Sequence, residues 1–330
     1  MPNPQRSIPA AITLFFVAPL VAEFLLGDFS VTWLPLLAVV APMYGGGPLL
    51  IREFARRSGR GWPTILLLGA AYALIEEGFT TQSLFNPHFL GMHLLSAAWI
   101  PALGIGAWWT LFMLNVHPFW SIGVSIALVE GLFPSRRRTP WLGNAGLGIA
   151  ALIFAAGIWF NTAYSIRTYH FIASWTQFLV TGLICILFIV AAFVLPKPAS
   201  RAASSPVPSP WAFGAVTFVL GAAVFFTPPM WNWGAVAWML AVDLAFLLLL
   251  WLFSSCSGWT ALHTFSVGAG GALFYGAHAF LQPPVVHTPS GIVLLSHALF
   301  FVLAIAVIAI AARRIKADRT TGLAAAPASA

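Results

Sequence analysis

The sequence predicts an all-α polytopic membrane protein, a transmembrane helix bundle of about ten spans with both termini in the cytoplasm. Sixty per cent of the 330 residues are hydrophobic and only 7% are charged, so most of the chain must be surrounded by lipid or by other apolar helices. The apolar residues are grouped in runs of about 20 residues, the length that an α-helix needs to cross a bilayer. The basic residues are distributed as this topology requires.

The apolar runs define the predicted spans in order. They cover residues 8–26, 31–51, 62–84, 107–133, 141–161, 174–195, 211–228, 233–254, 260–281 and 290–312. The first run contains Glu23 and has no small-residue cleavage site before Asp28. We therefore expect a retained span there and not a signal peptide.

The orientation follows from the basic residues, because Lys and Arg in short loops stay on the cytoplasmic side. With the N-terminus inside, the cytoplasmic segments contain every basic residue except Arg167. They are Arg6, Arg52, Arg56, Arg57, Arg60, Arg136, Arg137, Arg138, Lys197, Arg201, Arg313, Arg314, Lys316 and Arg319. The sequence therefore predicts a multi-pass protein of the cell membrane, either inner or plasma.

The net charge of +7 does not indicate nucleic-acid binding. The basic residues lie in short loops at helix ends, without an aromatic surface on which bases would stack. The lipid bilayer, including its anionic lipids, is the expected partner.

A segment rich in Pro, Ser and Ala, residues 196–210, divides the chain. It has no apolar face to bury, so we expect a cytoplasmic linker between a six-span module, residues 1–195, and a four-span module, residues 211–312. Residues 313–330 are predicted to be a disordered cytoplasmic tail. Between the third and fourth spans, Asn86 and Pro87 predict the start of a short helix on the outer surface.

Two consecutive acids, Glu76 and Glu77, lie deep in the third span. They precede its outer end by eight or nine residues, which places them roughly 12–14 Å below the surface. A carboxylate at that depth costs about 2.5–3.5 kcal/mol on insertion scales, so it is a candidate functional group. Consecutive helical residues point about 100° apart, so we expect one glutamate to face the site and the other to support it. Glu23 and Glu130 lie nearer helix ends and are interpreted as structural.

His117 in the fourth span lies at a matching depth, roughly 13 Å below the outer face. It shares one helix face with Thr110, Ser121 and Ser125, which predicts a polar stripe opposite the glutamates. Glu76, Glu77 and His117 are therefore the candidate catalytic residues, meeting around trapped water. The sequence contains no motif that requires a cofactor, but His117 and Glu77 are candidate ligands for a divalent metal.

A Glu-Glu pair in one span followed by a histidine in the next resembles the CPBP intramembrane endopeptidases, which process prenylated proteins and bacteriocins. The resemblance implies that Glu76 or Glu77 activates a hydrolytic water with help from His117, on a membrane-associated peptide substrate. The sequence departs from the family pattern EExxxR and FxxxH, since Thr81 replaces the arginine and Met113 replaces the phenylalanine. The segments EEG, SLFNP and PWLG are also similar to uncharacterised bacterial and archaeal membrane proteins.

Two alternatives remain open. Asp243 lies in the middle of the eighth span, and two inverted five-helix repeats would place it opposite the glutamates as a second coupling site of a secondary transporter. A scaffold without catalytic activity is the other alternative. No nucleotide-binding loop is present, which excludes an ATP-driven pump formed by this chain alone.

Overall fold

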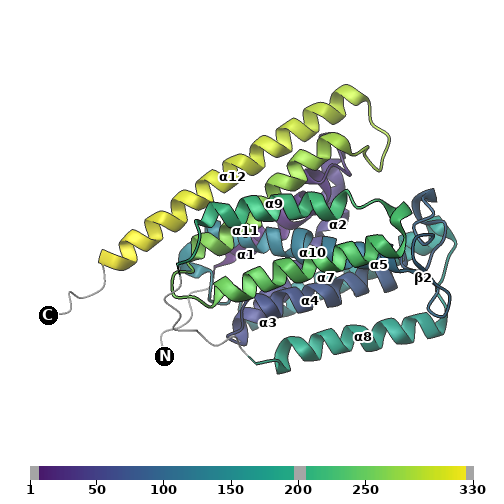
Figure 1. Cartoon of the computed structure of the whole chain (residues 1–330), viewed down its shortest axis with the longest axis horizontal. Helices are drawn as coiled ribbons and strands as arrows, with labels where there is room; N and C mark the ends of the chain where they lie inside the picture. The colour runs from purple at the N-terminus through teal and green to yellow at the C-terminus, as the bar shows by residue number, and fades with distance from the viewer. Residues whose placement is uncertain (1–6, 197–205, 325–330) are drawn as a thin grey trace.

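The computed structural model describes residues 7–196 and 206–324, and it confirms an all-α helical bundle (Figure 1). The first half contains α1 (Ile8–Pro19), η1 (Leu20–Leu25), η2 (Val31–Leu36), α2 (Leu37–Tyr44), α3 (Gly46–Arg57), α4 (Trp62–Leu74), η3 (Ile75–Thr80), η4 (Phe89–Gly91), β1 (Trp99–Ile100), β2 (Ile105–Gly106), α5 (Ala107–Asn115), η5 (Val116–Val124), α6 (Ser125–Leu132), η6 (Pro134–Arg136), α7 (Asn144–Tyr169) and α8 (Trp175–Val194). The second half contains α9 (Pro210–Phe225), η7 (Pro229–Trp231), α10 (Trp233–Ser254), α11 (Ala261–His278), η8 (Ala279–Leu281) and α12 (Ser290–Ala324).

Helices form over all ten predicted spans. Among the described residues, seven of these helical stretches are long and apolar enough to cross a membrane, and α9 is apolar but shorter. The two others are α4 with η3, which carries the Glu-Glu pair, and α11, which contains several glycines and is mostly buried. Both are lined by other helices and not by lipid alone, so polar and small residues are tolerated in them.

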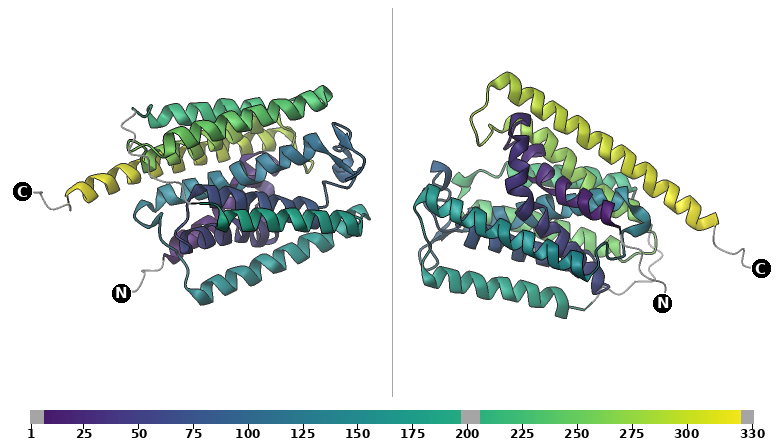
Figure 2. Two further views of the ribbon diagram at one scale, coloured as in Figure 1. Left: turned by 60° about the horizontal axis from the view of Figure 1, so that its bottom comes forward. Right: turned by 180° about the vertical axis from the view of Figure 1, so that it is seen from behind.

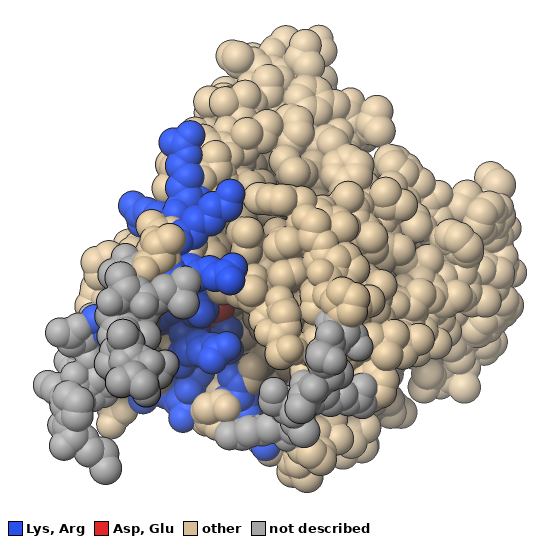
Figure 3. All heavy atoms as spheres, turned by 60° about the vertical axis from the view of Figure 1, so that its left-hand side comes forward, with Lys and Arg blue, Asp and Glu red and all other residues tan. Residues whose placement is uncertain are grey.

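The basic residues gather at one end of the bundle, as the positive-inside pattern predicts (Figure 3). Ser7 donates a backbone hydrogen bond to Trp141 (3.0 Å), and Arg137 pairs with Asp318 of α12 (3.3 Å). The first described residues and the last helix therefore meet the same loop, between α6 and α7. Arg6, Lys197 and Arg201, which were also predicted at this end, lie outside the described residues.

A buried ion-pair cluster anchors this end of the bundle. The side chain of Arg52, which is fully buried, pairs with Glu53 and with Glu130, each at 3.0 Å. Arg56 also pairs with Glu130, at 2.7 Å. The structural interpretation of Glu130 agrees with these contacts, although its partners are arginines of α3 and not the nearby Arg136–Arg138.

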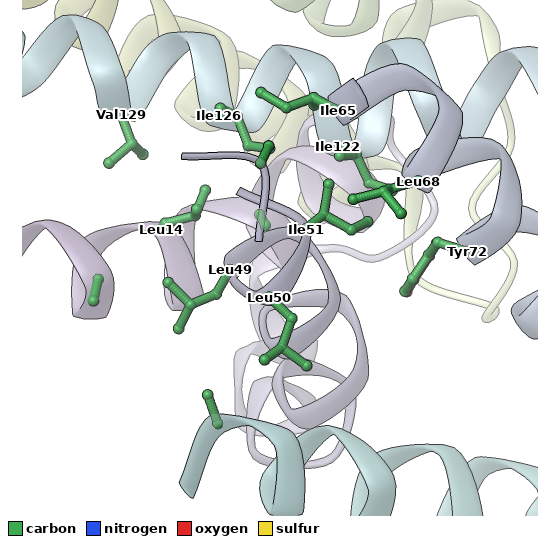
Figure 4. Packing of buried hydrophobic residues seen from close by; sticks show 14 of the residues in the cluster. Leu14, Leu49, Leu50, Ile51, Ile65, Leu68, Tyr72, Ile122, Ile126 and Val129 are labelled. Atoms are coloured by element: carbon green, nitrogen blue, oxygen red, sulfur yellow. The ribbon is translucent and has the colours of Figure 1, made fainter. Parts of the chain in front are cut away.

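The apolar core surrounds α4 and the η5–α6 helix. In the cluster of Figure 4, Leu14 of α1, Leu50 of α3 and Ile65 of α4 pack with Ile122 and Ile126. A second cluster joins the two halves of the chain, because Trp120 of η5 stacks on Tyr275 of α11 with ring centroids 6.1 Å apart. Helix α11 of the second half of the chain therefore packs directly on the helix that carries His117 (Figure 2).

Two local predictions are wrong. The outer segment after the third span is not a helix. It forms the three-residue turn η4 and the β1–β2 hairpin, because Leu90, His93 and Ala98 have positive φ angles near +50° that a helix does not allow. The predicted disordered tail is helical in its described part, since α12 continues without a break to Ala324. Only part of the predicted linker, residues 196 and 206–210, is described.

Candidate functional site

The candidate residues lie on π-helical turns, where the regular α-helix is interrupted. Glu76 and Glu77 belong to η3, which continues α4, and His117 belongs to η5, which separates α5 from α6. Pro118 follows His117 and has no N–H to donate, which explains the irregular turn in η5. In η3 the N–H of Thr81 bonds to the carbonyl of Glu76 five residues earlier, at 2.8 Å. Such turns occur frequently at functional sites.

The two carboxylates hold the imidazole from opposite sides. Oε2 of Glu76 lies 3.2 Å from Nδ1 of His117, and Oε1 of Glu77 lies 2.8 Å from Nε2. All three residues are buried, since Glu76 is 0% exposed, Glu77 6% and His117 3%. The predicted meeting of two acids and one histidine is therefore present, and each acid uses a different ring nitrogen.

Glu77 accepts hydrogen bonds on both of its carboxylate oxygens. Its Oε2 accepts hydrogen bonds from the hydroxyls of Thr81, at 2.8 Å, and of Ser83. Ser83 in turn accepts a hydrogen bond from the indole Nε1 of Trp109, at 3.1 Å. Because an ionised carboxylate only accepts, Nε2 of His117 must donate to Glu77, which leaves Nδ1 as the nitrogen with the lone pair when the ring is neutral.

Glu76 is the opposite case. Neither of its carboxylate oxygens has a hydrogen-bond partner, and neither does Nδ1 of His117, because their 3.2 Å contact lacks hydrogen-bond geometry. The hydroxyls of Tyr44 and Tyr72 are close enough to interact with this carboxylate, but that of Tyr72 is also without a hydrogen bond. Glu76 and Nδ1 are therefore the groups of the cluster that are free to bind a reacting atom.

A third carboxylate and a helix break adjoin the cluster. Glu23 lies on the π-turn η1 and interacts electrostatically with Glu76, Glu77 and His117. Tyr44 is the last residue of α2, where the Pro- and Gly-rich run of the second span interrupts the helix. Sequence reasoning missed Glu23, because its position near a helix end suggested a structural role. It also missed Ser83, although Thr81 and Ser83 follow the Glu-Glu pair at spacings that can reach back to it.

The donor set suits a divalent metal. Glu76, Glu77 and His117 each offer one ligand atom, and these atoms lie within 4.8 Å of one another. Two carboxylate oxygens and one imidazole nitrogen equal in number the three protein ligands of catalytic zinc sites, which keep a fourth position for water, although those sites contain more histidine or cysteine. The orphaned oxygens of Glu76 and the unpaired Nδ1 are the atoms that such an ion would use first.

Asp243 lies apart from this cluster. It is on α10, and its Oδ2 accepts a hydrogen bond from the side-chain amide of Asn115, at 3.0 Å. Among the described residues, no hydrogen bond or ion pair joins Asp243 to Glu76 or Glu77. The polar stripe of the fourth span is largely satisfied by its own helix, since Thr110 and Ser125 donate to the carbonyls of Gly106 and Ser121.

Fold and site together define a multi-pass α-helical membrane protein with a buried Glu-Glu-His cluster at interrupted helices. The chain belongs to an uncharacterized membrane protein family, whose model matches residues 12–323. The match covers the helices of the cluster and those of the second half of the chain alike. No curated protein and no solved structure matches the chain.

Proposed function

We propose that the protein is an intramembrane hydrolase that cleaves a membrane-associated peptide with a water activated by Glu76 and His117. The observation that supports this function best is the asymmetry of the two carboxylates. Glu77 is fixed by three donors and orients His117, whereas Glu76 and Nδ1 face each other 3.2 Å apart without hydrogen bonds. This is the arrangement of a base with an orienting partner.

The chemistry requires a water molecule that lies beside the 3.2 Å contact of Glu76 and Nδ1 and touches both groups. Glu76 or Nδ1 takes a proton from the water while the oxygen of the water attacks the peptide carbonyl carbon. The C–N bond then breaks, and the proton passes to the leaving amine. Glu77 stabilises the imidazolium whenever Nδ1 holds the proton, as a carboxylate does for a catalytic histidine. The site's resemblance to the CPBP endopeptidases, with their Glu-Glu pair and histidine, agrees with a peptide as the substrate.

The same residues would hold a divalent metal. A bound metal would supply a Lewis acid that lowers the pKa of its water. Glu76, Glu77 and His117 would each supply one ligand atom, and the hydroxyls of Thr81 and Ser83 would hold the second oxygen of Glu77 in place.

The test is cleavage in proteoliposomes. The full chain is reconstituted with a pool of synthetic single-span peptides, and the products are identified by mass spectrometry. We expect wild type to produce specific fragments and Glu76→Gln to reduce their rate by about 10²–10⁴-fold, the range for removal of a general base. Asp243→Asn is the matched control, because it neutralises another acid of the membrane region, and it should retain the rate. Equal cleavage by Glu76→Gln and wild type would contradict the proposal.

A proton-coupled transporter is the second candidate, favoured by the proximity of Glu23 to the cluster. Three acids and one imidazole from three interrupted helices resemble the protonatable relays of transporters. In this alternative, Glu23→Gln abolishes uptake driven by a proton gradient, and no peptide fragments appear. Asp243, the coupling site suggested by the sequence, accepts a hydrogen bond from Asn115 instead. Asp243→Asn therefore stops uptake if the transporter consists of two inverted repeats, and leaves uptake intact if Glu23 is the coupling site.

A further inference from the structure

A cavity opens at the basic end of the bundle, and none of its lining residues belongs to the Glu-Glu-His cluster. It has a volume of ≈ 490 Å³ and is bounded by the α3–α4 loop, α6, the loop after η6, the start of α11 and α12. This size lies within the range of small-ligand sites. Figure 3 shows Lys and Arg atoms gathered on this end, with a small acidic patch among them.

The lining is strongly basic. Arg56, Arg60, Arg137 and Arg138 line the cavity, and Glu130 is the one acidic residue among the described lining residues. Glu130 is already held by two arginines, since Arg52 binds it at 3.0 Å and Arg56 at 2.7 Å. Its charge is therefore compensated from within the protein, and the cavity keeps a positive surplus.

The remaining arginines are not neutralised equally. Arg60 donates to the carbonyls of Phe193 and Leu195 at the end of α8, which do not cancel its charge. Arg137 has an acidic partner, Asp318, at 3.3 Å. Arg138 makes no hydrogen bond or ion pair with the residues that the structure describes. Arg60 and Arg138 are thus the two cations whose charge is open to a ligand.

Two helix N-termini add to the positive potential. The α4 helix begins at Trp62 and the α11 helix at Ala261, and both residues line the cavity. The N-terminal turn of a helix carries partial positive charge, which favours phosphate. Fewer N–H groups are free here than usual, because Pro63 lies in the first turn of α4 and a capping box of Thr260 and His263 covers the start of α11. The two open cations and these helix ends point to the same ligand chemistry.

We propose that this cavity binds a phosphate group, carried either by an anionic phospholipid of the inner leaflet or by a small soluble phosphate compound. Basic pockets between transmembrane helices on the cytoplasmic side are suited to lipid headgroups. The guanidinium group of Arg138 recognises the phosphate oxygens, because its planar fork matches this geometry. Arg60, whose two terminal nitrogens already donate to carbonyls of α8, adds its positive charge.

The test is native mass spectrometry of the full chain in detergent, titrated with phosphatidylglycerol or with phosphatidylcholine, in the presence and absence of inorganic phosphate. We expect phosphatidylglycerol to bind more tightly than phosphatidylcholine, and Arg138→Gln to weaken it by about fivefold, the effect of one basic residue at an anionic surface. Arg138 has no partner to lose among residues 7–196 and 206–324, so this variant should fold normally. Arg60→Gln should act in the same direction.

The matched control is Arg313→Gln, which removes one charge from the same end of the molecule but from an exposed residue of α12 outside the cavity. We expect less than a twofold effect. Competition by inorganic phosphate identifies a soluble ligand as the source, and binding of phosphatidylglycerol without competition identifies the lipid. Equal weakening by Arg313→Gln and Arg138→Gln, or no weakening by Arg138→Gln, would overturn the proposal.

Discussion

Glu77 and His117 lie 2.8 Å apart across two helices that are both interrupted by π-turns. The contact joins the third span to the fourth at a point where neither helix has regular backbone geometry. Because Thr81 and Ser83 fill the other oxygen of Glu77, this pair is the fixed part of the site. Glu76, the residue before Glu77, is the part that is free to react.

The two glutamates should therefore affect stability differently. Glu77→Gln replaces an acceptor of three hydrogen bonds with a group that accepts fewer, and we expect a loss of about 1–3 kcal/mol in the free energy of unfolding. Glu76→Gln removes a buried carboxylate without hydrogen bonds, so stability should be unchanged or slightly higher. Thermal unfolding of the two variants in the same detergent measures the difference. A larger loss for Glu76→Gln would show that the roles are reversed.

Gly78 is expected to resist substitution because it follows Glu77 at a tight helix contact. A Cβ at this position would lie 2.6 Å from Cγ2 of Thr181 on α8. Gly78→Ala should destabilise the protein by about 1–3 kcal/mol, the usual effect of overpacking. Adding Thr181→Ser removes the opposing methyl group and should restore much of the lost stability, as measured by thermal unfolding. If the double variant is no more stable than Gly78→Ala, the steric explanation is wrong.

The buried Arg52 should be among the most sensitive positions at the basic end. It pairs with Glu53 and Glu130 and donates to three backbone carbonyls of the α6–α7 loop. Arg52→Ala leaves two buried acids with fewer partners, so we expect a loss of about 3–5 kcal/mol. Asp318→Ala breaks a partly exposed pair and should cost less than about 1 kcal/mol. Unfolding of both variants in parallel provides the comparison.

Metal binding can be measured independently of activity. If Glu76, Glu77 and His117 hold a metal, the purified protein should retain about one equivalent of zinc after dialysis, by elemental analysis. His117→Ala should lose the metal, and Asp243→Asn should keep it. Zinc retained by His117→Ala would place any metal elsewhere.

The topology is testable by cysteine labelling. His88 and Arg313 are both exposed, and the two native cysteines are buried. The positive-inside pattern predicts that a membrane-impermeant maleimide labels His88→Cys on intact cells. It should label Arg313→Cys only after permeabilisation. The reverse pattern would invert the orientation.

The helical segments were predictable because each span carries its own signal in a long apolar run. The depth match of Glu76, Glu77 and His117 was also predictable, since rise per residue fixes depth in a straight helix. The π-turn of η5 has a sequence signal in Pro118. The hydrogen bond of Trp109 to Ser83 beside η3 was not predictable, because it joins residues far apart in the sequence. The sequence predicts that one glutamate faces the site and the other supports it, but it does not show which glutamate has which role. That assignment required the hydrogen bonds of Thr81 and Ser83 to Glu77.

The outer segment was mispredicted for a related reason. Asn86 has the sequence of a helix cap, but its side-chain oxygen accepts from the N–H of His88, at 2.9 Å, in a local turn. Asn favours such turns as readily as helix caps, and only the neighbouring backbone decides between them.

The most direct measurement is an experimental structure of the full chain in lipid nanodiscs, at a resolution that shows ordered water. We expect the imidazole of His117 between the two glutamates, with Nε2 on Glu77 and a water or metal ion touching both Nδ1 and Glu76. A structure in which Glu76 is hydrogen-bonded to another protein group, or in which His117 is turned away from Glu77, would contradict the proposed site.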